Sequence, residues 1–242
     1  MSTGLLVLAA ALWGAAAGAS LPRAAYRFSV PSGEPWREEC PGGHAVAGWL
    51  GPASCRSCAK PGHGPRTAPL AIATAAVCAA LAAATGTRPE LAVWLLLAPA
   101  GVLLTVVDFR VRRLPDPLTL PFAATALALL GLTALVPEHA GRWTTALLGS
   151  LALGGGYFVL FLINPAGMGF GDVKLALGAG AVLGWYGWAT VMLGTLAGFL
   201  LGALYGLALV LTRRATRKTA IPFGPFLITG ALLGLLVGAY TA

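Results

Sequence analysis

The chain has 242 residues, of which 57% are hydrophobic and only 10% are charged, and its formal net charge is +8. Soluble domains carry about 25% charged residues, so this composition cannot cover a water-exposed surface and excludes an ordinary soluble enzyme. The basic residues gather in short segments between apolar runs, which indicates membrane topology rather than nucleic-acid binding. The sequence therefore predicts an all-α, polytopic membrane protein with the lipid bilayer as its solvent and no nucleic-acid partner.

Seven runs without Asp, Glu, Lys or Arg contain the expected membrane spans, each of which needs ~20 mainly apolar residues. The runs are Met1–Pro22, Thr67–Thr87, Leu91–Val107, Pro117–Pro137, Trp143–Gly171, Leu175–Thr212 and Thr219–Ala242. The fifth holds one helix ending near Ile163, because the glycine-rich residues after it are typical of a loop. The sixth is long enough for two helices, with a break at 185–188. We therefore expect eight helices, or seven if 174–183 is re-entrant.

The distribution of basic residues predicts the orientation. With eight spans and the N-terminus outside, every Lys and Arg lies on the cytoplasmic side except Arg88 and Arg142. The cytoplasmic basic residues include Arg110, Arg112, Arg113, Lys174, Arg213, Arg214, Arg217 and Lys218. The first run also resembles a signal peptide near residues 15–19, but it lacks a basic segment before the apolar run, which favours a retained helix.

Three domains are expected: a first transmembrane helix at 1–20, a cytoplasmic loop at 21–67 and a transmembrane domain at 68–242. The loop contains Cys55 and Cys58 at the Cys-x-x-Cys spacing that lets two thiolates share one metal ion. Cys40 and His44 would complete a four-ligand zinc site, and His63 is the alternative fourth ligand. Ordinary reduced thiols are the competing interpretation. Cys78 lies in the middle of a span and is expected to be a packing residue.

Two aspartates stand at the edges of apolar spans. Asp108 ends the run that begins at Leu91, and Asp172 follows the run that begins at Trp143. An ionisable group at a membrane edge is costly unless it has a partner or a task. Each aspartate alone could cap a helix or balance nearby arginines. Two carboxyl groups that meet could instead carry acid–base chemistry on a scissile bond.

The residues around the aspartates resemble a known family. Asp108 is followed by Leu-Pro-Asp-Pro-Leu-Thr-Leu-Pro at 114–121, and Asp172 lies in Gly-Met-Gly-Phe-Gly-Asp-Val-Lys at 167–174. Together with Ile-Pro-Phe-Gly-Pro-Phe at 221–226, these motifs resemble the type IV prepilin peptidases, which are membrane-embedded aspartic proteases of the Gly-x-Gly-Asp type. The resemblance extends over nearly the whole chain, including a Trp (Trp49) before the second cysteine pair.

The resemblance implies that Asp108 and Asp172 form a catalytic dyad, with Gly169, Gly171, Lys174, Pro115 and Asp116 as supporting motif residues. The implied substrates are prepilin or pseudopilin precursors, each with a short basic leader and a long apolar helix. Cleavage would take place at the cytoplasmic face of the bacterial inner membrane. Proteolysis by such a dyad requires no cofactor, because the two carboxyl groups share one proton and alternate as base and acid.

The chain departs from the family pattern in its loop. The family's first cysteine pair is Cys-Pro-x-Cys, whereas this chain reads Cys40-Pro41-Gly42-Gly43-His44, and the usual Asn after the first helix is absent. Many relatives also methylate the new N-terminus with S-adenosylmethionine, an activity associated with this region. We therefore expect peptidase activity with weak or absent methyl transfer. The competing functions are a small polytopic transporter and a non-catalytic assembly protein for pili or secretion.

Overall fold

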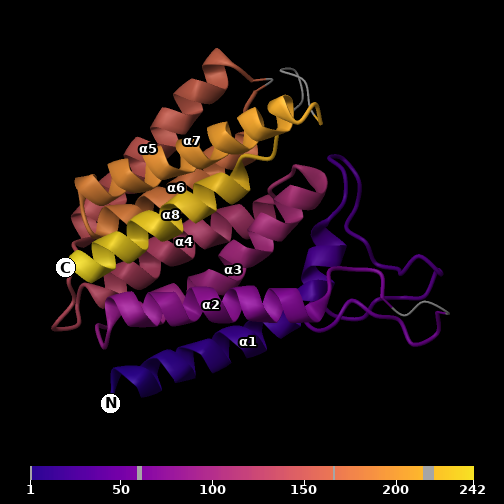
Figure 1. The fold of residues 1–242 in the computed structure, drawn as a ribbon, viewed down its shortest axis with the longest axis horizontal. Helices are drawn as coiled ribbons and strands as arrows, with labels where there is room; N and C mark the ends of the chain where they lie inside the picture. Colours follow the sequence, from indigo (N-terminus) through magenta and orange to yellow (C-terminus); the bar gives the residue numbers. More distant parts are fainter. Residues whose placement is uncertain (1, 59–61, 166, 215–220) are drawn as a thin grey trace.

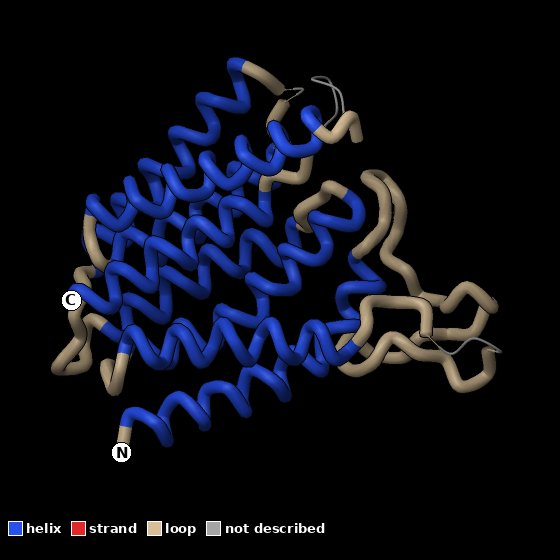
Figure 2. Tube along the Cα trace, viewed as in Figure 1, coloured by secondary structure: helices blue, strands red, loops and turns tan. Residues whose placement is uncertain are grey.

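The computed structural model describes residues 2–58, 62–165, 167–214 and 221–242 (Figure 1). This part of the chain folds into eight helices and contains no strand beyond two isolated bridges (Figure 2). The helices are α1 Thr3–Phe28, α2 Thr67–Thr85, α3 Glu90–Val111, α4 Asp116–Thr133, α5 Trp143–Ile163, α6 Phe170–Trp185, α7 Trp188–Leu211 and α8 Gly224–Thr241. The predicted all-α architecture is confirmed.

Seven of the eight helices are long and apolar enough to cross a membrane, which identifies a multi-pass membrane protein. The predicted end of α5 at Ile163 is confirmed, as is the break between α6 and α7. Gly187 makes that break with a φ of 103°, a backbone conformation that favours glycine.

Helix α6 has only 16 residues, yet it runs the length of the bundle, since its rise is about 24 Å. Its first turn packs on Leu114, directly after α3. At its other end the Tyr186 hydroxyl donates to Glu90 Oε1, at the start of α3, over 3.2 Å. Twelve of its residues are buried, and it packs against α4, α5, α7 and α8. These contacts disagree with a re-entrant α6.

Helix α1 continues to Phe28, eight residues beyond the predicted boundary at residue 20. Pro22 lies inside it, although a helix-interior proline removes one backbone hydrogen bond. The extra turns bury Ala24, Ala25 and Phe28 in a core cluster shared with α2 and α3. This burial accounts for a helix that the composition alone would end earlier.

Small residues bring consecutive helices into close contact, as expected where lipid supplies no hydrophobic drive between helices. On α1, a Cβ added at Gly14 or Gly18 would lie within 2.6 Å of an α2 carbonyl oxygen. Gly149 and Gly180 play the same part between α5 and α6, and further glycines pack α7 against α8. The bundle is therefore built from three tightly packed pairs, with α3 and α4 between them.

The two ends of the bundle differ in charge. We call the end where α3 finishes and α6 begins the aspartate end, and the opposite end, where both termini lie, the far end (Figure 1). All described Lys and Arg residues lie toward the aspartate end except Arg88 and Arg142, which contact Ala239 and Trp185 at the far end. Lys60, Arg217 and Lys218 lie outside the described residues.

Candidate active site

Asp108 lies in the last turn of α3 and is only 4% exposed. Its Oδ2 accepts a hydrogen bond of 3.0 Å from the backbone N–H of Gly224, the first residue of α8. The first N–H groups of a helix have no partner within the helix, and the helix dipole places partial positive charge there. The start of α8 therefore holds the Asp108 carboxyl group in place.

A Cβ on Gly224 would lie 2.8 Å from Asp108 Oδ2, so a side chain there would displace the Asp108 carboxyl group. Gly224 is not among the site residues predicted from the sequence. The Ile-Pro-Phe-Gly-Pro-Phe motif at 221–226 contains Gly224, but the sequence alone does not show that this motif contacts Asp108.

Asp172 is held by its own helix. It lies in the first turn of α6 and is 6% exposed. Its Oδ2 accepts a hydrogen bond of 3.2 Å from the Gly169 N–H, and its own N–H donates to the Gly169 carbonyl over 3.0 Å. This reciprocal pair resembles a capping box. The other carboxyl oxygen, Oδ1, is buried without a hydrogen-bond partner among the described residues.

The two motif glycines have different surroundings. A Cβ on Gly171 would lie 2.8 Å from the Cβ of Leu114, so the first turn of α6 is pressed against the segment that follows Asp108. A Cβ on Gly169 would lie 3.5 Å from Asp172 Oδ2 and 3.9 Å from Gly171 N, which are ordinary contacts. Gly171 is thus required for the approach of the two aspartate-bearing segments, and Gly169 is not.

Asp108 and Asp172 line one cleft of about 420 Å³ at the aspartate end. The cleft is also lined by residues of the α3–α4 connection, of the start of α6 and of the loop between α1 and α2, residues 29–66, which we call the N-terminal loop. These further residues include Ser32, Trp36, Arg112, Arg113, Leu114, Asp116, Gly169, Gly171 and Lys174. Two buried carboxyl groups from different helices therefore line one cleft.

The predicted supporting residues join α4 to α6. Pro115 is the N-cap of α4, and Asp116 is its first residue. Asp116 forms an ion pair with Lys174 of α6, with 2.6 Å between Asp116 Oδ1 and Lys174 Nζ. The ammonium group of Lys174 also lies 4.9 Å from the centre of the Phe170 ring. Lys174 therefore pairs within the protein, at the rim of the cleft.

Tyr157 of α5 is a further residue near the site that the sequence analysis missed. It is 1% exposed, and its hydroxyl has no hydrogen-bond partner among the described residues. Its ring packs near Phe199 and Phe223, and it belongs to the core cluster that includes Leu114 and Val173. Nothing in the sequence marked this tyrosine, because it lies inside an uncharged apolar run.

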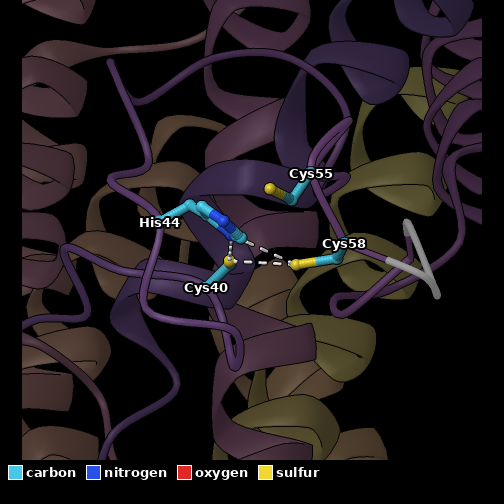
Figure 3. A group of neighbouring side chains, drawn as sticks. All are labelled: Cys40, His44, Cys55 and Cys58. Atoms are coloured by element: carbon cyan, nitrogen blue, oxygen red, sulfur yellow. Dashed lines mark hydrogen bonds between the residues drawn. The ribbon is translucent and has the colours of Figure 1, made fainter.

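The N-terminal loop brings Cys40, His44, Cys55 and Cys58 together, with their ligand atoms all within 4.8 Å of one another (Figure 3). Cys40 Sγ lies 3.4 Å from Cys58 Sγ, and His44 Nδ1 lies 3.5 Å and 3.4 Å from these two atoms. Tetrahedral zinc with Cys and His ligands separates its ligand atoms by about 3.5–3.8 Å, from the usual bond lengths. The donor set and its spacing therefore fit a four-coordinate zinc ion.

The loop backbone builds this cluster through a tight turn. The Cys40 N–H donates to the His44 carbonyl over 2.9 Å, and the Gly43 N–H returns a bond of 2.9 Å to Cys40. Gly43 has a φ of 76°, and a Cβ on Gly42 would lie 2.8 Å from Cys58 Sγ. The two glycines let His44 occupy a ligand position one residue later than the cysteine of the family pattern.

The thiols of this cluster differ in acidity. Burial raises the pKa of the Cys40 thiol, but hydrogen bonds from the His44 and Gly42 backbone and from Cys58 outweigh it, and its pKa falls to about 6. The hydrogen bond with Cys40, burial and the neighbouring Cys55 raise the pKa of Cys58 to about 11. The cluster thus stabilises one thiolate, and a bound cation would have to displace the proton of Cys58.

His63 does not join the cluster. Its ring packs edge-on against Tyr26, with 4.5 Å between centroids, so His44 is the histidine of the predicted ligand set. Cys78 is fully buried on α2 in the core cluster of the far end, as predicted for a packing residue.

Comparison with known proteins agrees with these motifs. The model of the type IV leader peptidase family matches residues 91–207, which include both aspartates. A prepilin leader peptidase/N-methyltransferase of Pseudomonas aeruginosa is 31% identical over 235 residues, covering 89% of this chain and 75% of the relative. The chain belongs to the type IV leader peptidase family.

Other relatives carry the same name. The Burkholderia pseudomallei protein is 30% identical over 239 residues, which cover 90% of this chain and 71% of the relative. The Aeromonas salmonicida protein is 36% identical over 152 residues, which cover 60% of this chain. This match spans about half of the relative, 48% of its length. No solved structure matches the chain.

Proposed function

We propose that the protein is a membrane-embedded aspartic endopeptidase that removes the leader from prepilin-like precursors. The observation that carries the proposal is the pair Asp108 and Asp172, two buried carboxyl groups from different helices that line one cleft. The names of the relatives, prepilin leader peptidase/N-methyltransferase, supply the substrate class.

In the proposed reaction, the two carboxyl groups hold one proton between them. The ionised carboxylate removes a proton from water, and the water oxygen attacks the scissile carbonyl carbon. The protonated carboxyl group donates a hydrogen bond to the carbonyl oxygen and polarises it. The tetrahedral intermediate then collapses, the C–N bond breaks, and a carboxyl proton passes to the leaving amine.

The fixed hydrogen bonds explain how the dyad is held ready. Gly224 and Gly169 each donate to one oxygen of a carboxyl group, which leaves the second oxygen of each aspartate for water, substrate or the shared proton. Groups positioned in advance avoid reorganisation during the reaction.

We place the cleft at the cytoplasmic face. The aspartate end carries every described Lys and Arg except Arg88 and Arg142. Cytoplasmic loops of membrane proteins are enriched in these residues. This orientation lets the leader of a membrane-anchored precursor reach the dyad from the cytoplasm.

We assign a structural role to the Cys and His cluster. Cys40, His44, Cys55 and Cys58 would supply all four ligands of a zinc ion, and such closed sites stabilise folds rather than activate water. The cluster therefore holds the N-terminal loop in shape. S-adenosylmethionine-dependent methylation is proposed to be weak or absent, because the Asn expected after the first helix is missing.

Co-expression with a candidate precursor tests the function. We expect wild-type protein to convert the precursor to a shorter form on a gel, and Asp108→Asn or Asp172→Asn to abolish conversion. Glu138→Gln, an exposed acid of the α4–α5 connection, is the matched control and should leave cleavage intact. Continued cleavage by either aspartate variant would refute the dyad, and a transporter or assembly protein predicts no conversion by any form.

Mass spectrometry of the processed N-terminus tests methyl transfer separately. We expect an unmethylated residue when this protein is the only processing enzyme present. A fully methylated product would show that methyl transfer survives in this chain.

A further inference from the structure

We propose that the N-terminal loop forms a leader-binding subsite of the cleft, with Trp36 as the residue that contacts the leader. This inference rests on the proposed function and extends it to substrate recognition. Ser32 and Trp36 line the cleft together with Asp108 and Asp172, although they lie more than 70 residues earlier in the chain. They also lie outside residues 91–207, which the family model matches.

Arg113 ties this part of the loop to the catalytic segment. It follows Asp108 by five residues, and its Nη1 donates a 2.7 Å hydrogen bond to the Pro31 carbonyl. Its guanidinium group also lies 4.7 Å from the centre of the Trp36 ring, in cation–π contact. The loop side of the cleft, which we call the loop wall and which contains Ser32 and Trp36, is therefore fixed to the segment that follows α3.

Trp36 is supported from the helical side as well. The ring of Phe28, at the end of α1, packs against it at 72°, with 5.0 Å between centroids. Trp36 is half-buried, so its neighbours orient the indole while part of it remains open to the cleft. An oriented aromatic side chain binds a peptide with little loss of conformational entropy.

A second cavity near the dyad indicates which part of a substrate lies against the loop wall. This cavity, of about 310 Å³, is lined almost entirely by apolar side chains. It begins one turn from the dyad, at Thr105, Leu175 and Ile228, and continues toward the far end. An apolar segment beyond the scissile bond is thus favoured on the bundle side of the dyad. The polar leader would then bind in the charged cleft, against the side formed by Ser32 and Trp36.

The chemistry of the loop wall fits a short extended polar peptide. Trp36 offers an indole surface for the aliphatic stems of leader side chains, and the Ser32 hydroxyl can donate to or accept from the peptide backbone. Arg112 and Lys174 stand on the other sides of the cleft. The subsite therefore recognises leader residues that lie more than two positions before the scissile bond.

Trp49 provides a matched control. It lies in the same loop, packs on the same Phe28 ring at 4.7 Å, and makes a cation–π contact with Arg27 at 3.9 Å. It does not line the cleft. Replacing either tryptophan removes an aromatic contact to α1, but only Trp36 is placed to touch the leader.

Steady-state cleavage of purified precursor tests the subsite. We expect Trp36→Ala to raise KM by about tenfold with kcat changed less than twofold, since the contact is lost equally from bound substrate and transition state. Trp36→Phe should recover most of the loss, and Trp49→Ala should behave like wild type. On a precursor whose leader is cut to the two residues before the scissile bond, the difference between Trp36→Ala and Trp49→Ala should shrink.

A photo-crosslinking amino acid at position 36 or 49, in the Asp172→Asn background, gives a readout independent of turnover. With an epitope tag on the leader of the uncleaved precursor, proteolytic digestion after crosslinking should leave the tagged leader peptide attached at position 36 and not at position 49. Equal kinetics for Trp36→Ala and Trp49→Ala, or crosslinks from position 36 to the mature part alone, would overturn the subsite. Failure of the wild-type enzyme to cleave would instead refute the proposed function.

Discussion

The two aspartates depend on different parts of the chain. Asp172 obtains its hydrogen bond from Gly169, three residues earlier, whereas Asp108 obtains its bond from Gly224, 116 residues later. A local motif is therefore sufficient to orient one carboxyl group, and the other needs the completed bundle. This difference makes the Asp108 side of the site the more sensitive to changes in helix packing.

The two motif glycines give a sharp prediction at the residue scale. Gly171→Ala places a methyl group 2.8 Å from Leu114 Cβ, which forces the start of α6 away from the segment after Asp108. We expect precursor cleavage to fall by at least about 100-fold, because small misplacements of catalytic groups have effects of this size. The measurement is kcat/KM on purified precursor.

Gly169→Ala is the control for this prediction. Its added methyl group meets only ordinary contacts and its backbone φ is −75°, so we expect activity within about threefold of wild type. Equal losses for the two variants would show that steric room at Gly171 is not what the motif provides.

The helices that carry the two aspartates, α3 and α6, are joined at both ends. At the aspartate end Gly171 contacts Leu114, and at the far end the Tyr186 hydroxyl donates to Glu90 Oε1. Glu90 is fully buried and also accepts a bond from the Ala140 N–H. The far-end bond thus fixes the relative register of the two helices, at a distance from the proposed dyad.

Removing that bond should lower stability. Tyr186→Phe deletes the donor to Glu90 and leaves a buried carboxyl oxygen with one partner fewer, which costs about 1–3 kcal/mol. Thermal unfolding in detergent measures the loss as a lower Tm. Tyr240→Phe, on an 81% exposed side chain of α8, should leave Tm unchanged. A Tm for Tyr186→Phe equal to that of the control would contradict a stabilising role for the far-end bond.

Most elements of this fold were predictable because charge-free length is a physical requirement of a membrane helix. The break at 185–188 and the end of α5 at Ile163 were both visible in residue type. The extension of α1 to Phe28 was not, because it depends on burial against α2 and α3. The contacts of Gly224 with Asp108 and of the loop with the cleft were also hidden, since both join segments far apart in sequence.

At the scale of the whole molecule, the N-terminal loop is held to the bundle by Arg113 and organised internally by the cysteine cluster. We expect purified protein to carry about one zinc ion per chain and Cys55→Ser to carry far less, because a three-ligand site binds zinc more weakly. Cys78→Ser changes a buried thiol outside the cluster and should keep its zinc. Elemental analysis of both variants decides the matter, and retention of zinc by Cys55→Ser would contradict the assignment.

The acidity of the cluster predicts how zinc affinity changes with pH. The raised pKa of Cys58, about 11, means that zinc must displace its proton at neutral pH, so affinity falls as pH falls. Below the pKa of Cys40, about 6, this thiol becomes protonated as well and the fall steepens. Competition with a chromogenic chelator between pH 5 and pH 8 measures this dependence, and a pH-independent affinity would argue against thiolate ligation.

The polarity of the bundle gives a prediction for its orientation in the membrane. Thr87, in the α2–α3 turn, and Arg214, after α7, are both exposed but lie at opposite ends of the bundle. With the aspartate end in the cytoplasm, a membrane-impermeant thiol reagent should label Thr87→Cys in intact cells and should label Arg214→Cys only after permeabilisation. The native cysteines should stay silent in intact cells, since three lie in the loop at the aspartate end and Cys78 is buried. Labelling of Arg214→Cys but not Thr87→Cys in intact cells would invert the topology and place the cleft outside the cytoplasm, where the leader of a membrane-anchored precursor could not reach it.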